Sequence, residues 1–104
     1  IWRSMRKIIS YLGFAKKSNN LIIGQSPIKR TDKKLYLILT SASASENLDN
    51  LAKNVANKHN CVHLKLNLEL SDLINLKDIK IIGITDYNLA KAIIDNKESI
   101  IGKQ

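Results

Sequence analysis

The side chains best suited to binding a ligand are four closely spaced cations that follow a glycine. Lys29, Arg30, Lys33 and Lys34 lie a few positions after Gly24. Ammonium and guanidinium groups at this density bind the phosphates of a polyanion, and such binding depends on salt because it releases counterions. Glycine lets the backbone come close to a phosphate. We therefore expect a phosphate-binding patch here, rather than the alternative of a solvated charged loop.

The distribution of charge along the chain supports this expectation. Residues 1–34 hold nine bases and one acid, Asp32, which leaves +8, whereas residues 35–104 hold eight lysines and eight acids. The whole net charge of +8 therefore comes from the first third of the chain. Such segregation is expected when one face of a protein meets a nucleic acid. A generally lysine-rich, solvated surface is the alternative.

Catalytic and metal-binding chemistry is less well supported. His59, Cys61 and His63 carry groups that bind zinc, but no fourth ligand of matching type lies nearby, so we expect no metal and no cofactor. Cys61 and His63 would lie side by side on one strand without an orienting acid, so we expect no enzyme activity. The serines between Ser41 and Ser45 lack the glycines and the Gly-Lys-Ser/Thr ending of a phosphate loop.

The spacing of apolar residues predicts the elements that position these groups. Steps of three and four residues predict helices over residues 5–17, 48–59 and 68–76, and a last helix that starts after Thr85 or Asp86. Pro27, suited to a first turn, predicts a short helix over residues 25–30. Ser43 and Glu46 have the spacing of a capping box for the helix over residues 48–59. Apolar runs predict strands over residues 21–24, 35–39, 61–66 and 79–84. This alternation favours an α/β fold, with a sheet covered on both faces by helices.

Length and composition indicate one globular domain. The chain has 104 residues, of which 44% are hydrophobic and 25% charged, enough for one core and too few for two. It has no apolar run of about 18 residues and no secretory leader, and its lone cysteine suits a reducing compartment, so we expect a cytoplasmic protein with no membrane association. Residues 1–4 precede Met5 and are interpreted as a cloning remnant, and residues 96–104 as a tail.

Three stretches of the chain carry a family resemblance. They are LGFAKK at 12–17 followed by LIIG at 21–24, LYLIL at 35–39 followed by SASASEN at 41–47, and ITDYNLAKAI at 84–93. In this order they resemble parts of the kink-turn RNA-binding ribosomal proteins, and in particular their small bacterial YlxQ-like branch. The resemblance implies a three-layer α/β/α sandwich with a four-stranded mixed sheet and no catalytic activity.

The resemblance also implies where RNA would bind. Contacts in that family begin at the glycine that ends the first strand and continue into the next helix, which here gives Gly24, Gln25, Ser26, Lys29 and Arg30. Ribosomal relatives place an Asn-Glu pair after the glycine to read base edges, and this chain has Ser26 and Pro27 instead. Because proline offers no side-chain donor or acceptor, we expect phosphate binding without that form of base readout.

Other parts of the expected site are further from the glycine. A second contact loop in the family precedes the last strand, and here it corresponds to residues 76–79, with Lys77 as its only base and Ile79 at its end. The rim of the site comprises Lys16, Lys17, Lys33 and Lys34. Gly13 is interpreted as a packing position and not as a contact.

The leading hypothesis is a monomeric, non-catalytic RNA-binding protein. We expect structured RNA as its partner, because the five aromatic residues are too scattered to form a stacking platform for single strands. The resemblance implies that this RNA is kink-turn-like and ribosomal, and that the ribosome is a further partner. Two alternatives stay open. One is the substrate-binding domain of an RNA-modifying enzyme such as a 2′-O-methyltransferase, and the other is a protein-interaction module that uses the less buried face of the strand from Cys61 to Lys65.

Overall fold

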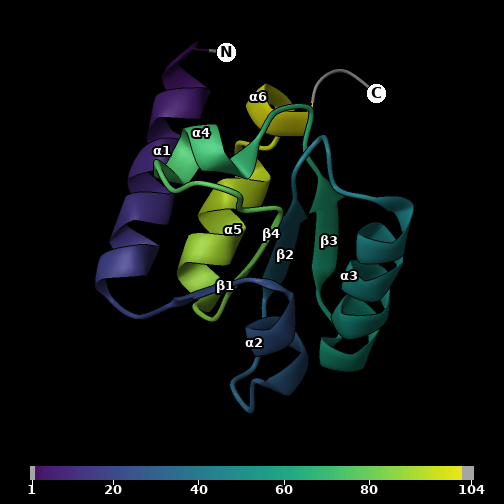
Figure 1. Ribbon diagram of the computed structural model, residues 1–104. Coiled ribbons are helices and arrows are strands. Elements are labelled where there is room, and N and C mark those ends of the chain that lie inside the picture. The colour runs from purple at the N-terminus through teal and green to yellow at the C-terminus, as the bar shows by residue number, and fades with distance from the viewer. Residues whose placement is uncertain (1, 102–104) are drawn as a thin grey trace.

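The computed structural model describes residues 2–101, with side chains from residue 5 onward (Figure 1). Helices and strands alternate along most of the chain, as the sequence predicts. Their bounds are α1 (Trp2–Lys17), β1 (Leu21–Ile23), α2 (Gln25–Arg30), β2 (Leu37–Thr40), α3 (Glu46–His59), β3 (Val62–Lys65), α4 (Leu70–Ile74), β4 (Ile81–Ile84), α5 (Tyr87–Asp95) and α6 (Glu98–Ile101).

The strands form one mixed sheet of four strands in the order β1-β4-β2-β3. Strand β4 is antiparallel to both of its neighbours, and β2 is parallel to β3. A parallel pair needs a long crossover connection, which α3 supplies. The two strands at the edges of the sheet are therefore β1 and β3.

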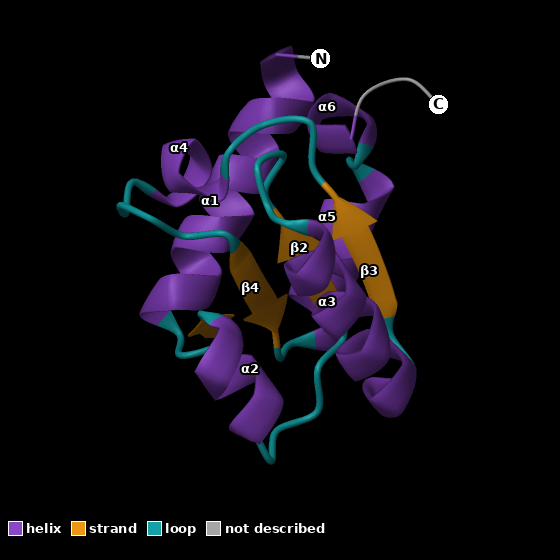
Figure 2. Ribbon diagram, turned by 45° about the vertical axis from the view of Figure 1, so that its right-hand side comes forward, coloured by secondary structure: helices purple, strands orange, loops and turns teal. Residues whose placement is uncertain are grey.

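Two layers of helices enclose the sheet, which confirms the expected three-layer α/β/α sandwich. Helices α1, α4, α5 and α6 pack on one face, and α2 and α3 pack on the other (Figures 1 and 2). Strand β2 alternates between the two cores, because Leu37 and Leu39 face the first layer and Ile38 faces the second. All of these side chains are fully buried.

Helix α1 owes its position to one apolar stripe. Ile8, Leu12 and Ala15 recur at steps of three and four residues and are fully buried against the sheet. From residue 5 onward, the cations of the helix lie off this stripe and are exposed; they are Arg6, Lys7, Lys16 and Lys17. Gly13, interpreted from the sequence as a packing position, is exposed, and a Cβ added to it would meet nothing within 4 Å. That interpretation is wrong, because Gly13 lies off the buried stripe.

The cap of α3 differs from the capping box that the sequence indicates. Helix α3 begins two residues later than that box requires, and its N-cap is Ser45, whose Oγ accepts a hydrogen bond from the Leu48 N–H at 3.1 Å. Ser43 instead donates from its Oγ to Glu69, at 2.7 Å. Three serines within five residues offer several caps, and the bond to Glu69 decides which of them is used. Helix α5 is capped by Asp86, one of the two residues expected.

The segment expected as a tail belongs in part to the fold. Residues 98–101 form α6, and Ile100 is fully buried in the first core. The carbonyl of Ile100 accepts a hydrogen bond from the Asn67 N–H at 2.7 Å, just after β3. A turn this short has too weak a pattern to be recognised from sequence alone. None of the helices described is long and apolar enough to cross a membrane.

Candidate nucleic-acid interface

The two segments expected to contact RNA are neighbours in the structure. Gly24 follows β1 directly, with φ at 100°, a conformation that favours glycine. Its N–H donates a hydrogen bond to the carbonyl of Ile81 at 3.1 Å, at the start of β4. The loop before β4 therefore lies beside the β1–α2 junction, although more than fifty residues separate the two in sequence.

The loop before β4 is held by serine hydroxyls. Ser41 Oγ donates to the carbonyl of Ile79 at 3.1 Å, and the Ile79 N–H donates to Ser71 Oγ at 3.2 Å. Since both backbone groups of Ile79 are occupied, this residue can offer a ligand only its half-buried side chain. Lys77 is exposed and is followed by the exposed Asp78, so the loop adds little net charge.

Helix α2 presents its polar residues in two pairs. Ile28 is buried in the second core and fixes the rotation of the helix. Ser26 and Arg30 are four residues apart and share one face, and Gln25 and Lys29 share another. All four are exposed. Within residues 5–101 neither Lys29 nor Arg30 forms a side-chain hydrogen bond or ion pair, so both cations are available to an anion.

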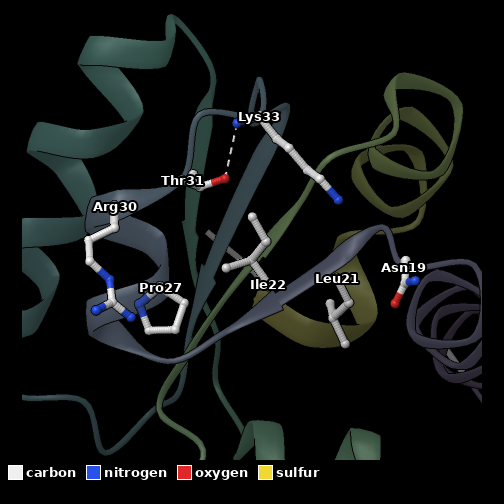
Figure 3. A pocket seen from close by; sticks show the side chains of 7 residues that line it. All are labelled: Asn19, Leu21, Ile22, Pro27, Arg30, Thr31 and Lys33. Carbon is white, nitrogen blue, oxygen red and sulfur yellow. Dashed lines mark hydrogen bonds between the residues drawn. The ribbon is translucent and has the colours of Figure 1, made fainter.

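A shallow groove of about 380 Å³ joins the end of α2 to the end of α1 across strand β1 (Figure 3). Its lining residues are Asn19, Leu21, Ile22, Pro27, Arg30, Thr31 and Lys33. Thr31 Oγ1 accepts a hydrogen bond from the Lys33 N–H at 3.1 Å, which shapes the turn after α2. The structure thus brings two of the expected cations, Arg30 and Lys33, to one groove.

Lys34, expected on the same rim, lies apart from this groove. Its Nζ donates a hydrogen bond to the carbonyl of His59 at the end of α3 and lies 5.9 Å from the centre of the Tyr36 ring. Neither group lines the groove. The cluster of four cations in the sequence is therefore divided, because Leu35 enters the core directly after Lys34 and turns the chain toward α3.

Lys16 and Lys17 lie at the last turn of α1 and are exposed. Asn19 follows with φ at 62°, in the left-handed region that asparagine tolerates, and the chain then enters β1. The end of α1, strand β1, α2 and the linker after it all lie at the lower end of the molecule in Figure 1. Lys7, ten residues before Lys17, lies roughly 15 Å away along the helix axis and does not belong to this end.

The histidines and the cysteine have structural surroundings. His59 Nδ1 accepts a hydrogen bond from the Leu35 N–H at 3.1 Å, and His63 Nε2 lies 2.8 Å from Thr40 Oγ1. Burial lowers the pKa of both histidines and raises the pKa of the Cys61 thiol, which keeps all three groups neutral near pH 7. In the part of the chain that the structure describes, no three His, Cys, Asp or Glu side chains gather as metal ligands would.

Sequence reasoning missed the residues that complete the groove. The sequence pattern places Leu21 and Ile22 in a strand and Pro27 in a short helix, and it assigns no role to Asn19. They become surface residues of a groove because β1 is an edge strand, a fact of topology that local pattern does not contain. The Asn-Asn turn before the strand is a signal for a sharp reversal, and it would have suggested that the end of α1 and β1 lie close together.

Comparisons with known proteins support the fold. No family model and no curated protein sequence matches the chain. The solved structure of a protein of unknown function from Bacillus halodurans C is similar, with a TM-score of 0.72 and 16% sequence identity, over 86% of this chain and 95% of that one. A likeness at this level of identity shows a shared fold.

Proposed function

We propose that this chain is a non-catalytic RNA-binding protein that holds a folded, kink-turn-like RNA through the surface around Gly24 and α2. The resemblance of three stretches to the kink-turn RNA-binding ribosomal proteins supplies the class of RNA. It also supplies ribosomal RNA as the partner. The protein acts as a monomer in the cytoplasm, the location expected from its composition. The charge of the first third of the chain supplies the driving force, because phosphates bound by lysine and arginine release counterions.

One observation carries this proposal. The hydrogen bond from the Gly24 N–H to the Ile81 carbonyl, at 3.1 Å, joins the two segments through which such an RNA would be gripped. Next to this junction are Lys29 and Arg30, which have no ion pair within residues 5–101. Cations without partners are expected at a surface that is completed by a polyanion, because an internal salt bridge would compete with the phosphate.

An electrophoretic mobility shift assay tests the proposal. The full chain is titrated into a kink-turn RNA and into a linear duplex of equal length, at several salt concentrations. We expect tighter binding to the kink-turn and a log-log salt slope of about −3 to −5, if about four to six phosphates are neutralised. A flat salt response, or equal affinity for the two RNAs, would contradict the proposal.

A pair of double variants distinguishes the effect of the α2 surface on RNA affinity from the effect of net charge. Replacing Lys29 and Arg30 together by alanine is expected to weaken binding to the kink-turn RNA and the duplex alike, because phosphate contacts carry no sequence information. The matched control replaces Lys53 and Lys58 of α3, which are exposed and change the net charge equally. If the control weakens binding as much as the first variant, the α2 surface is not the site.

A second candidate function, binding of a protein, is favoured by one observation. Val62 and Tyr87 are 43% and 58% exposed and line a groove between the edge strand β3 and helix α5. Exposed apolar groups that share a groove are typical of interaction sites. Isolation of the full chain with a bound protein and no nucleic acid, and loss of that protein in a Val62→Lys variant, would favour this function over RNA binding.

A further inference from the structure

Strand β1 carries an open backbone edge within the groove. The Thr85 N–H donates to the Asn20 carbonyl at 2.9 Å, and the Gly24 N–H donates to the Ile81 carbonyl at 3.1 Å. In an antiparallel pair the residues bonded to one neighbour alternate along the strand. The even-numbered residues of β1 therefore face β4, and Leu21 directs its N–H and C=O to the other side. Since β1 is an edge strand, no strand meets these groups within residues 2–101.

The groove wraps around this edge. Neighbouring residues of a strand point to opposite faces of the sheet, and accordingly Leu21 packs against the core under α1 while Ile22 packs against the core under α2. Both line the groove, so the groove must cross from one face to the other over the open edge. Pro27 adds a rigid apolar wall on the α2 side (Figure 3).

Polar groups surround the apolar part of the groove. Arg30 of α2 lies beside Pro27, Asn19 lies beyond Leu21 in the turn after α1, and the side chain of Lys33 extends from the linker toward the side of Leu21 and Asn19 (Figure 3). In the described part of the chain, neither cation has a side-chain hydrogen bond or ion pair. The groove thus offers positive charge, a flat apolar wall, a side-chain amide and an open pair of backbone donor and acceptor within one surface.

We propose that this groove binds one unpaired nucleotide that continues from the structured RNA. Its phosphate binds Lys33, with Arg30 at the Pro27 side of the groove, its base rests on Pro27 and Ile22, and the edge of the base exchanges hydrogen bonds with Asn19 or with the backbone of Leu21. The choice of RNA rests on the function proposed above. Unpaired nucleotides present the face and the edge of the base together, which a nucleotide within a duplex does not.

An acidic peptide is the competing ligand. An added peptide strand would also use the open backbone of β1, and its carboxylates would meet the same cations. Strand β1 has three residues, which is a short template for a strand. The flat apolar surface of Pro27 would contact little of an extended peptide with small side chains, but a nucleotide base can stack against it. These features favour the nucleotide.

Amide chemical shifts of the full chain, titrated with a single-stranded hexauridylate, test this inference. We expect shift changes at Asn19, Leu21 and Lys33 that saturate together. Lys33→Ala is expected to weaken binding roughly tenfold, as for loss of one charge-assisted contact, and Lys33→Arg to restore it. Asn19→Gly, which keeps the left-handed backbone, is expected to weaken binding without changing the fold.

The outcomes separate this inference from the function it extends. Hexauridylate that shifts only residues near Gly24, or none, overturns the nucleotide site even if the kink-turn RNA binds well. Saturation at the groove supports the site even if the kink-turn RNA binds no better than a duplex, in which case the proposed function fails. Equal shifts with hexaglutamate would show a site for any polyanion and would overturn the assignment to a nucleotide.

Discussion

The backbone N–H of Leu35 donates a hydrogen bond to Nδ1 of His59 at 3.1 Å and so ties the end of the basic linker to the end of α3. The preceding residue, Lys34, makes the same connection, because its Nζ donates to the His59 carbonyl. Two consecutive residues are thus directed to α3, and the chain before them stays free to face β1. This connection decides which cations belong to the candidate site.

The first prediction concerns pH. The acceptor Nδ1 of His59 must be unprotonated, and burial lowers its pKa, with Lys34 and Lys58 lowering it further. Protons therefore bind more readily to the unfolded chain, whose histidine titrates near pH 6.5. We expect the contribution of His59 to the free energy of unfolding to be constant above about pH 7.5 and to fall as the pH drops through about 6.5 toward the lowered pKa of the folded state.

Urea denaturation at several pH values measures this effect. His59→Asn keeps an acceptor oxygen but cannot be protonated, so it should reduce the loss of stability on acidification. Burial also lowers the pKa of His63. This histidine should therefore account for part of the loss of stability that the His59→Asn variant still shows on acidification. An increase in the free energy of unfolding between about pH 7.5 and 6 would contradict the prediction.

The second prediction compares two adjacent lysines. Lys33→Ala removes a cation from the groove and should weaken binding of the kink-turn RNA and reduce its salt slope by about 1. Lys34→Ala removes a cation held against His59 and Tyr36, so it should change RNA affinity much less. Mobility shift assays at several salt concentrations compare the two variants. Equal losses would mean that the RNA surface extends toward α3.

The third prediction compares two glycines. A Cβ on Gly83 would lie 2.8 Å from Leu35 Cδ2, so Gly83→Ala should lower the free energy of unfolding by about 1–3 kcal/mol through overpacking. Gly13→Ala adds a methyl group to open space in a helix and should raise it by about 0.5–1 kcal/mol. Urea denaturation of both variants checks the signs, and a stable Gly83→Ala protein would show that Leu35 can move aside.

The fourth prediction tests the cap of α3. Ser45→Ala removes the acceptor for the Leu48 N–H and should lower the free energy of unfolding by about 1 kcal/mol. Ser43→Ala removes a bond to Glu69 on an exposed surface and should cost less, because exposed polar pairs contribute little. Thermal denaturation ranks the two variants. The reverse order would restore the capping box with Ser43.

Local patterns predicted the elements well, because each one buries residues at its own period. The apolar stripe of α1 indicates the one face that packs, and the unbroken apolar run of β2 indicates a strand that is buried on both faces. The cap at Ser45 and the burial of Ile100 could not be predicted, since each depends on a partner distant in sequence, Glu69 in one case and Asn67 in the other.

The candidate site was predicted less completely than the fold. Charge counting along the sequence identified Arg30 and Lys33, and the groove contains both. It also included Lys34, because a linear count cannot detect that the chain turns into the core at Leu35. Asn19 and Leu21 carry no charge, and only the position of β1 at an edge makes them part of the surface.

The register of β1 has a consequence for synthesis of the protein. Leu21 pairs with Ile84, and β1 has no other neighbour in the sheet. During synthesis, a chain that has emerged only as far as β3 therefore contains all the cations of the first third. It lacks β4, the strand with which β1 pairs. Closing so long a loop is slow compared with forming a helix, so the basic surface is assembled only once β4 is in place. An incomplete chain should accordingly bind RNA only non-specifically, through the electrostatic attraction of its unordered cations.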